Sequence, residues 1–271
     1  MGRSSDLEKL CKLVRRDVLT ISHNAHIGHV GSSFSITEIL VTLYFSVMNV
    51  NSKKPSDPDR DRFILSKGHA GASLFSVLYR KGYISKKEFG TFCKDGSRLL
   101  VHPEWNGLPG IEHGTGSLGH GLSVGVGMAY AAKLLDKKYR VFVLVSDAEI
   151  QEGTVWEAAI FAAHHKLDNL VVVLDYNGMQ ALGKVKEVLD IDPIEKKWRS
   201  FNFETALVDG HNLKMLNNTF KKFYNAGKGP KIVIAKTVMG KGVSFMENDF
   251  RWHYYDPKEE HMKTAMEELK L

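Results

Sequence analysis

Two polar residues follow two apolar segments of strand character, and their side chains suit a divalent cation. Val141–Val145 runs into Asp147, and Leu170–Leu174 runs into Asn177, so each polar residue lies just beyond the carboxyl end of a predicted strand. Between them lies a helix-forming segment, Val155–His165. If the strands are parallel neighbours, both side chains reach one edge of the sheet, where open α/β sheets bind ligands.

The chemistry of these two side chains predicts a magnesium site. A carboxylate and an amide oxygen are hard donors, and the remaining octahedral positions would go to phosphate oxygens, water and a backbone carbonyl. Met179 is the candidate for that carbonyl. Taken singly, Asp147 is explained as a helix cap and Asn177 as a turn residue before Gly178. Their separation of thirty residues, which fits one strand–helix–strand unit, favours the metal site.

The elements that must position this site alternate along the second half of the chain. Short β-branched segments are separated by helical patterns, which predicts a doubly wound α/β fold with a mainly parallel sheet and helices on both faces. No linker or internal repeat interrupts the sequence, so we expect a single domain over residues 1–271. The predicted strands are Arg62–Leu65, Val141–Val145, Leu170–Leu174, Thr205–Val208 and Ile232–Ala235.

The first half is predicted to be mainly helical. Capping boxes at Ser5-x-x-Glu8, Ser35-x-x-Glu38 and Ser85-x-x-Glu88 each precede an apolar-periodic segment. At the other end, Lys258–Leu271 has apolar residues at helical spacing, which predicts a closing helix and favours a separate subunit over a truncated chain.

Composition argues against several other classes of protein. The net charge is +6, but basic residues are interleaved with acidic ones and form no basic stripe, so nucleic-acid binding is not expected. No apolar run approaches the roughly 20 residues of a membrane-spanning helix. The N-terminus lacks the apolar core of a signal peptide. With only Cys11 and Cys93, the chain is expected in a reducing cytoplasm.

The segment around the predicted metal site resembles the thiamine diphosphate motif of transketolases. That motif is usually Gly-Asp-Gly-Glu followed about thirty residues later by Asn, and here Ser146-Asp147-Ala148-Glu149 precedes Asn177. The resemblance covers nearly the whole chain, through Gly28-His29-Val30-Gly31, Asp59–Phe63, Leu65–His69, His102-Pro103-Glu104, Thr115–Gly119, Glu152-Gly153, Trp156–Ala158, Leu167–Leu170, Asp175–Asn177 and Val208–His211.

The resemblance implies thiamine diphosphate and Mg²⁺ as cofactors and assigns roles residue by residue. Proton movement on sugar hydroxyls near neutral pH suits imidazoles. By the resemblance, His69 would contact the cofactor or the reacting carbon, and His29, His102 and His253 would bind hydroxyls of the donor sugar. The implied catalytic residues are His29, His69, His102, His253 and Glu152. The implied cofactor contacts are His69, Gly116, Ser117, Leu118, Asp147, Ala148, Glu149, Asn177 and His253, and the implied metal ligands are Asp147, Asn177 and Met179.

Three departures from the family pattern lie close to these residues. Ser146 and Ala148 replace glycines beside the metal-binding Asp, and the methyl group of Ala148 stands where backbone usually approaches the diphosphate. Val30 replaces a usual Pro. Tyr254 follows His253 where the family has Gly. The first departure predicts slightly weaker or displaced cofactor binding.

One catalytic group of the family has no counterpart in this sequence. The carboxylate that activates the aminopyrimidine comes from a following domain in transketolases, and this chain ends after the first domain. The resemblance therefore implies the N-terminal subunit of a two-chain transketolase. It would act on ketose phosphates and aldose acceptors, with a C-terminal partner subunit in an α2β2 heterotetramer.

Two alternatives remain open. The chain could belong to another thiamine diphosphate enzyme, such as a 2-oxoacid dehydrogenase alpha chain or a deoxyxylulose phosphate synthase. The set His29, His69 and His102 favours transketolase over the dehydrogenase. A non-catalytic scaffold is the other alternative, and the joint retention of Asp147 and Asn177 argues against it.

Overall fold

The chain, described by a computed structural model over residues 4–224 and 227–271, is built around a parallel sheet. The sheet has five strands in the order β1-β2-β3-β7-β6, and every pair of neighbours is parallel. All predicted strand segments are present, with ends that differ by at most two residues. The strands are β1 (Arg62–Leu65), β2 (Val141–Ser146), β3 (Leu170–Tyr176), β6 (Glu204–Asp209) and β7 (Lys231–Lys236).

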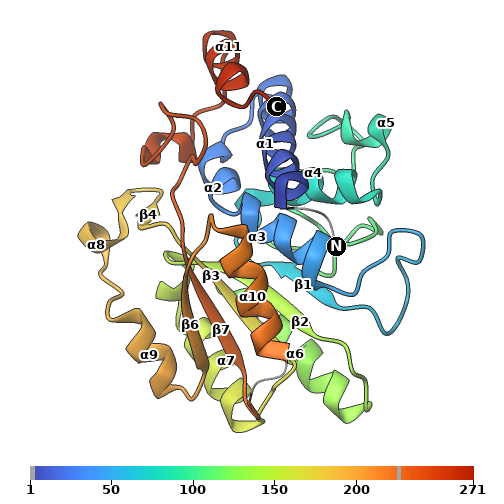
Figure 1. Cartoon of the computed structure of the whole chain (residues 1–271), viewed down its shortest axis with the longest axis vertical. Coiled ribbons are helices and arrows are strands. Elements are labelled where there is room, and N and C mark those ends of the chain that lie inside the picture. The colour runs from blue at the N-terminus through green and yellow to red at the C-terminus, as the bar shows by residue number, and fades with distance from the viewer. Residues whose placement is uncertain (1–3, 225–226) are drawn as a thin grey trace.

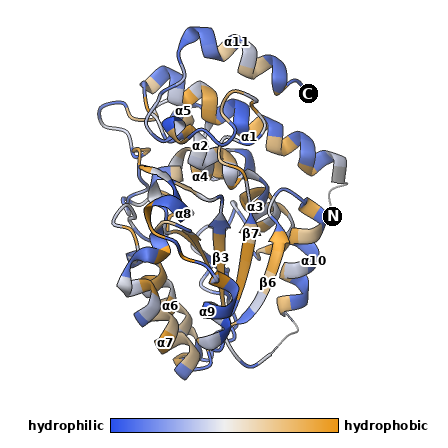
Figure 2. Cartoon of the chain, turned by 90° about the vertical axis from the view of Figure 1, so that its left-hand side faces the viewer, coloured by the Kyte–Doolittle hydropathy of each residue, from blue (hydrophilic) through white to orange (hydrophobic). Residues whose placement is uncertain are grey.

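The central strands are apolar on both faces because helices cover both (Figure 1). Along β2, Phe142 and Leu144 belong to one hydrophobic core, whereas Val143 and Val145 belong to the other. The first core is shared with α1 (Ser4–Ala25), α3 (Thr37–Thr42), α4 (Gly71–Lys81) and α10 (Leu213–Tyr224). The second is shared with α6 (His120–Leu134), α7 (Gly153–His164) and α9 (Ile194–Ser200). The doubly wound α/β prediction is confirmed, and Figure 2 shows the mainly apolar strands β6 and β7 between the helices.

The helical prediction for the first half is confirmed, but two of its three capping boxes are wrong. Ser85 caps α5 (Lys86–Phe89), since its Oγ accepts a hydrogen bond of 3.1 Å from the Glu88 amide. Ser5 lies inside α1 rather than before it. Ser35 ends α2 (Val30–Ser35), and its hydroxyl donates to Asp175 instead of capping α3.

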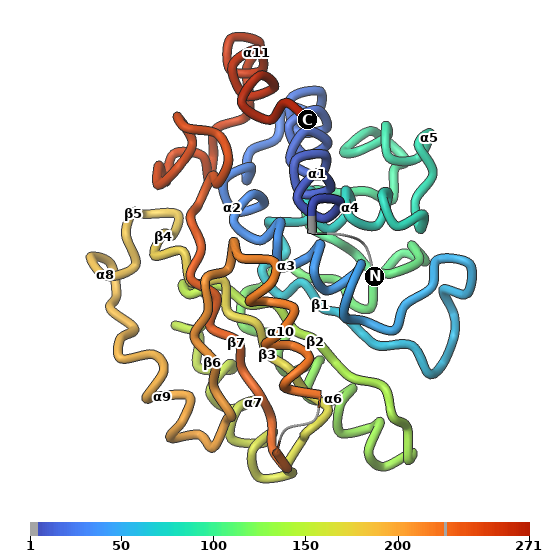
Figure 3. The backbone as a smooth tube through the Cα atoms, in the orientation of Figure 1, coloured from blue at the N-terminus to red at the C-terminus, as the bar shows by residue number. Residues whose placement is uncertain are grey.

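Shorter elements complete the chain, and Figure 3 traces them. A small antiparallel hairpin that the sequence did not predict follows β3, formed by β4 (Met179–Gln180) and β5 (Gly183–Lys184). The closing helix is confirmed as α11 (Glu259–Glu268), which packs beside α1. The others are the π-helical turn η1 (Leu43–Val47), the 3₁₀ turns η2 (Gly68–Ala70), η3 (Glu149–Gln151) and η4 (Phe250–His253), and α8 (Val185–Val188). Over the described residues, none of the helices is both long and apolar enough to cross a membrane.

Helix α6 approaches the sheet closely because glycine occupies the positions that face it. A Cβ atom at Gly125 would overlap Cγ2 of Val143 in β2. At Gly127, on the outer side of the same helix, a Cβ atom would meet nothing within 4 Å. Gly125 is therefore needed for the close packing of α6 on the sheet, whereas Gly127 is not, although both lie in the middle of the helix.

Alanine at these two positions should change stability in opposite directions. Gly127→Ala should stabilise the chain by about 0.5–1 kcal/mol, since alanine is the better helix former and has free space. Gly125→Ala should destabilise it by about 1–3 kcal/mol, since the added methyl group must displace Val143. Denaturant unfolding of both variants checks this, and a stabilised Gly125→Ala variant would contradict the close packing.

Candidate functional site

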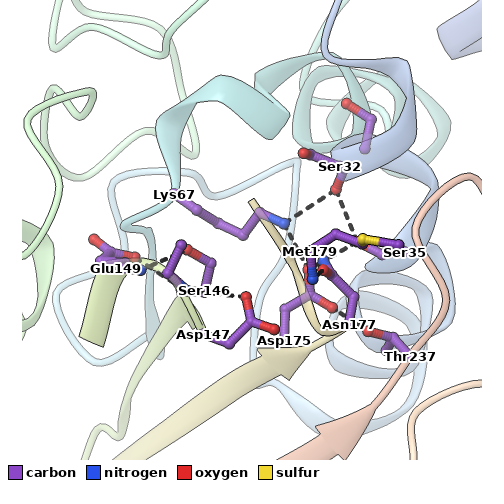
Figure 4. Close-up of polar contacts among 12 residues, drawn as sticks. Ser32, Ser35, Lys67, Ser146, Asp147, Glu149, Asp175, Asn177, Met179 and Thr237 are labelled. Atoms are coloured by element: carbon purple, nitrogen blue, oxygen red, sulfur yellow. Dashed lines mark hydrogen bonds and ion pairs between the residues drawn. The ribbon is translucent and has the colours of Figure 1, made fainter. Parts of the chain in front are cut away.

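The carboxyl ends of the parallel strands bring Asp147 and Asn177 together as the sequence predicted (Figure 4). We call this end of the sheet the carboxyl edge. Ser146 of β2 pairs with Asp175 of β3, so the residues that follow each strand start from the same level. Oδ2 of Asp147 accepts a hydrogen bond of 2.6 Å from the amide of Gly178, the residue after Asn177.

Asp147 is a carboxyl group whose surroundings disfavour its charge. It has no exposed surface, and Oδ1 accepts a further hydrogen bond of 2.9 Å from the Ala148 amide. Burial, followed by repulsion from Asp175, raises the pKa of Asp147 to about 7. A bound cation would reverse this effect, because it stabilises the carboxylate form. The Asp147 carboxylate is therefore suited to act as a metal ligand.

Asn177 and Met179 flank Gly178, whose amide bonds to Asp147. Oδ1 of Asn177 accepts a hydrogen bond of 2.9 Å from the Met179 amide, and its Nδ2 donates to Asp175 at 3.0 Å. No cluster of three or more His, Cys, Asp or Glu side chains suited to a metal occurs among the described residues. A cation here would need further ligands such as phosphate oxygens, water and the Met179 carbonyl.

A cavity of about 200 Å³ opens beside these residues. Ser146 and Ala148, which flank Asp147, both line it, and so does the buried Lys67. The predicted site residues that line it are His69, Leu118, Ala148, Glu152, Asn177, Met179 and His253. Those that do not are His29, His102, Gly116, Ser117, Asp147 and Glu149.

Four histidines that lie far apart in sequence form one cluster. The ring centroid of His29 lies 5.5 Å from that of His69, 6.0 Å from that of His102 and 4.8 Å from that of His253. The His69 and His253 rings are 5.1 Å apart. His29 takes the left-handed conformation at φ 64°, and its amide donates to the His253 carbonyl at 3.0 Å. This bond joins the loop before α2 to the turn η4.

The histidine cluster is held in its neutral form. Burial, with smaller contributions from His253, His102 and Lys67, lowers the pKa of His29 to about 4. Burial and then Lys67 lower the pKa of His253 to about 4, and the pKa of His69 is also well below its usual value for these two leading reasons. Nδ1 of His29 is buried without a hydrogen-bond partner in the described part of the chain. Such an atom suits a polar ligand.

The loop before α6 contributes Leu118 to the cavity and passes close to the histidines. A Cβ atom at Gly116 would lie 3.3 Å from Cδ2 of His102, and φ there is 149°, so glycine fits best. Gly116 and Ser117 are exposed.

The two predicted glutamates have different environments. Glu149 is fully buried, and its carboxylate accepts hydrogen bonds from Ser66 Oγ, from the Gly119 amide at 2.8 Å and from the Ser146 amide at 3.1 Å. These hydrogen bonds are all to protein groups, and its predicted cofactor contact stays a prediction. Glu152 is exposed, lines the cavity and precedes α7.

Comparison with known proteins identifies the family. A family model described as the transketolase thiamine diphosphate binding domain matches residues 8–270. The chain belongs to the transketolase family.

Similar transketolases are of two lengths. An apulose-4-phosphate transketolase subunit of Actinobacillus succinogenes is 41% identical over 98% of this chain and 96% of its own length. The 6-deoxy-6-sulfo-D-fructose transketolase subunit SqwG of a Clostridium species is 37% identical over 97% and 96%, respectively. The solved transketolase of Campylobacter jejuni is 29% identical with a TM-score of 0.90, and this chain covers 43% of it. The chain thus spans less than half of that solved transketolase but nearly the full length of the two subunits.

These comparisons confirm the predicted family, its fold and its thiamine diphosphate-binding character. They also confirm the prediction that the chain corresponds to the N-terminal subunit of a split transketolase. The roles of individual residues stay predictions.

Sequence reasoning missed two residues at the centre of the site. Lys67 and Asp175 form an ion pair with 2.6 Å between Nζ and Oδ2, and neither side chain is exposed. Both belong to motifs of the family resemblance, but neither was predicted to have a role of its own. Their positions could have indicated a role at the carboxyl edge. Asp175 directly follows five apolar residues, Leu170–Leu174, and Lys67 lies two residues after the end of β1.

The neutral histidine cluster makes stability depend on pH in a definite direction. The pKa values of His29 and His253 are about 4 in the folded chain against 6.5 in the unfolded one. Between these values the unfolded chain binds more protons, so stability is full above pH 6.5 and is lost as the pH falls toward 4.

The double variant His29→Gln/His253→Gln should lose less stability than the parent between pH 7 and pH 5, because glutamine does not titrate. Denaturant midpoints at the two pH values measure this difference. The control His164→Gln, at an exposed site on α7, should behave like the parent. An equal loss in the double variant and the parent would show that these rings are not held neutral.

Proposed function

We propose that this chain is the N-terminal subunit of a two-chain transketolase, which transfers a two-carbon ketol unit from a ketose phosphate to an aldose acceptor. It would act as one thiamine diphosphate-binding domain, and the partner chain would supply the rest of the active site. The observation that carries the proposal is a cavity lined by Asn177, His69 and His253, with Asp147 beside it through the Gly178 amide and His29 in ring contact with His69.

The carboxyl edge is suited to hold Mg²⁺ and the diphosphate. Asp147, Asn177 and the Met179 carbonyl would bind the metal, and Leu118 would pack against the ring portion of the cofactor. When bound, thiamine diphosphate would supply a nucleophilic carbon and an electron sink. The buried Asp147 has its pKa raised to about 7, which supports a cation as its missing counter-charge.

The histidine cluster is suited to bind sugar hydroxyls. A neutral imidazole donates one hydrogen bond and accepts another, which matches a hydroxyl in both respects. His29, His102 and His253 would orient the donor sugar, while His69, which lines the cavity, would contact the cofactor. The partnerless Nδ1 of His29 supports this assignment.

Helices α6 and α7 support assembly with other chains. They pack together through Tyr130 and Phe161, with ring centroids 5.4 Å apart. The part of α6 from His120 to Ala132 contains no Asp, Glu, Lys or Arg, and both helices are largely apolar in Figure 2. Four large apolar side chains on or next to these two helices are exposed, namely Leu134, Leu135, Ile160 and Phe161 at 68%, 70%, 58% and 41%, and we refer to this set as the apolar patch. Such a patch favours burial in an interface, in keeping with an α2β2 heterotetramer.

The names of similar subunits suggest the kind of substrate. Those relatives are named for apulose-4-phosphate and 6-deoxy-6-sulfo-D-fructose, and both names describe sugars with an anionic group. We infer a ketose with a phosphate or a comparable anion, in carbohydrate metabolism of the pentose phosphate type. The free thiols of Cys11 and Cys93 agree with a cytoplasmic enzyme.

The metal site can be tested by removing Asp147. In the assembled enzyme, thiamine diphosphate with Mg²⁺ should raise the melting temperature, because a ligand that binds only the native state stabilises it. Asp147→Ala should abolish this shift, and Asp95→Ala, at an exposed position, should retain it. A shift of normal size in Asp147→Ala would remove Asp147 from the site, whereas the absence of any shift in the parent would favour the scaffold alternative.

The two-chain proposal predicts that activity depends on the partner. The purified chain alone should show no transfer of a two-carbon unit between a ketose phosphate and an aldose phosphate, and it should self-associate through the apolar patch. Addition of the partner subunit should restore transfer. The measurement is a coupled turnover assay with size-exclusion chromatography, and appreciable turnover by this chain alone would defeat the proposal.

A further inference from the structure

Several side chains from different segments donate hydrogen bonds to the carboxylate of Asp175, which lies next to the site (Figure 4). Its Oδ2 accepts from Ser35 Oγ at 2.7 Å, from Lys67 Nζ at 2.6 Å and from Asn177 Nδ2 at 3.0 Å. Its Oδ1 accepts from Thr237 Oγ1. These donors come from α2, from the loop after β1, from the turn after β3 and from the end of β7.

The bond to Asn177 decides which end of its amide faces the cavity. A carboxylate oxygen can only accept, so the amide nitrogen must point toward Asp175. The amide oxygen then points to the other side, where it accepts from the Met179 amide at 2.9 Å and keeps a second lone pair. Asn177 lines the cavity, and we infer that this second lone pair is the one that a ligand there would use. A flipped amide would place oxygen against oxygen.

Lys67 offsets part of the electrostatic cost of placing Asp175 beside Asp147. Its ammonium group is fully buried and donates to Asp175 and, at 3.2 Å, to the Ser32 carbonyl. Asp147 has no ion pair of its own among the described residues, so a cation bound beside it would supply its counter-charge.

We propose that Asp175, neutralised by Lys67, is a positioning residue that holds the Asn177 amide oxygen toward the metal and diphosphate. The inference rests on the proposed function, because it assumes that Mg²⁺ binds at Asp147 and Asn177. Groups that orient metal ligands without touching the metal change metal affinity by about 10- to 100-fold when they are removed.

Charge-balanced double variants separate positioning from electrostatics. Lys67→Met/Asp175→Leu removes one charge of each sign and the acceptor for Asn177, and replacement of both partners of a buried pair by apolar residues commonly preserves folding. Lys67→Met/Asp175→Ala makes the same change with a smaller side chain. Lys67→Met/Asp175→Asn keeps an acceptor for Asn177. Arg15→Met/Glu38→Gln alters another buried ion pair, 2.7 Å long, as a control.

The measurement is the affinity of the assembled enzyme for Mn²⁺ in the presence of thiamine diphosphate, by electron paramagnetic resonance. The Leu and Ala variants should bind Mn²⁺ about 10- to 100-fold more weakly, while the Asn variant and the control should bind like the parent. Parental affinity in a folded Leu or Ala variant would overturn the positioning role. Equal weakening in the Asn variant would also overturn it, since the loss would then belong to Lys67. Failure of the parent to bind Mn²⁺ would instead refute the proposed function.

Discussion

The buried ion pair between Lys67 and Asp175 is the constraint on which the carboxyl edge depends. Transfer of two charges out of water costs on the order of several kcal/mol per ion, and only close geometry with additional hydrogen bonds offsets it. Here Ser35, Thr237 and Asn177 supply those bonds. Because each donor belongs to a different segment, the requirement to satisfy one carboxylate fixes the relative positions of α2, the loop after β1, the turn after β3 and the end of β7.

The same pair also adds to the effect of burial on the pKa values of its neighbours. Lys67 is the second largest cause, after burial, of the lowered pKa of His69 and His253, whereas Asp175 is the second largest cause of the raised pKa of Asp147. The edge thus holds neutral imidazoles on one side and a carboxyl group in need of a cation on the other. Sugar hydroxyls and a metal-bound diphosphate are the ligands that these two environments would favour.

Sequence patterns predicted what depends on period and topology. Apolar runs located the five strands, and their parallel order explained why Asp147 and Asn177 meet. Contacts between distant residues were not accessible in this way. Ser35 fits a local capping rule, but its hydroxyl bonds to Asp175, 140 positions away, and Lys67 pairs with Asp175 across 108 positions. Glu149 was placed at the cofactor by resemblance, although its hydrogen bonds serve Ser66, Gly119 and Ser146.

Helix α7 connects the cavity to the apolar patch, and this has a consequence for the proposed enzyme. Glu152 lines the cavity and immediately precedes the helix, while Ile160 and Phe161 lie exposed further along it. In the proposed enzyme, a cofactor in contact with Glu152 and a chain in contact with Ile160 and Phe161 would both stabilise this one helix, so cofactor binding would strengthen association. Since coupling between two binding events is reciprocal, association would strengthen cofactor binding by the same factor. A site divided between two chains would then be fully stabilised only in the assembly, because cofactor binding and association would each supply part of the stabilisation.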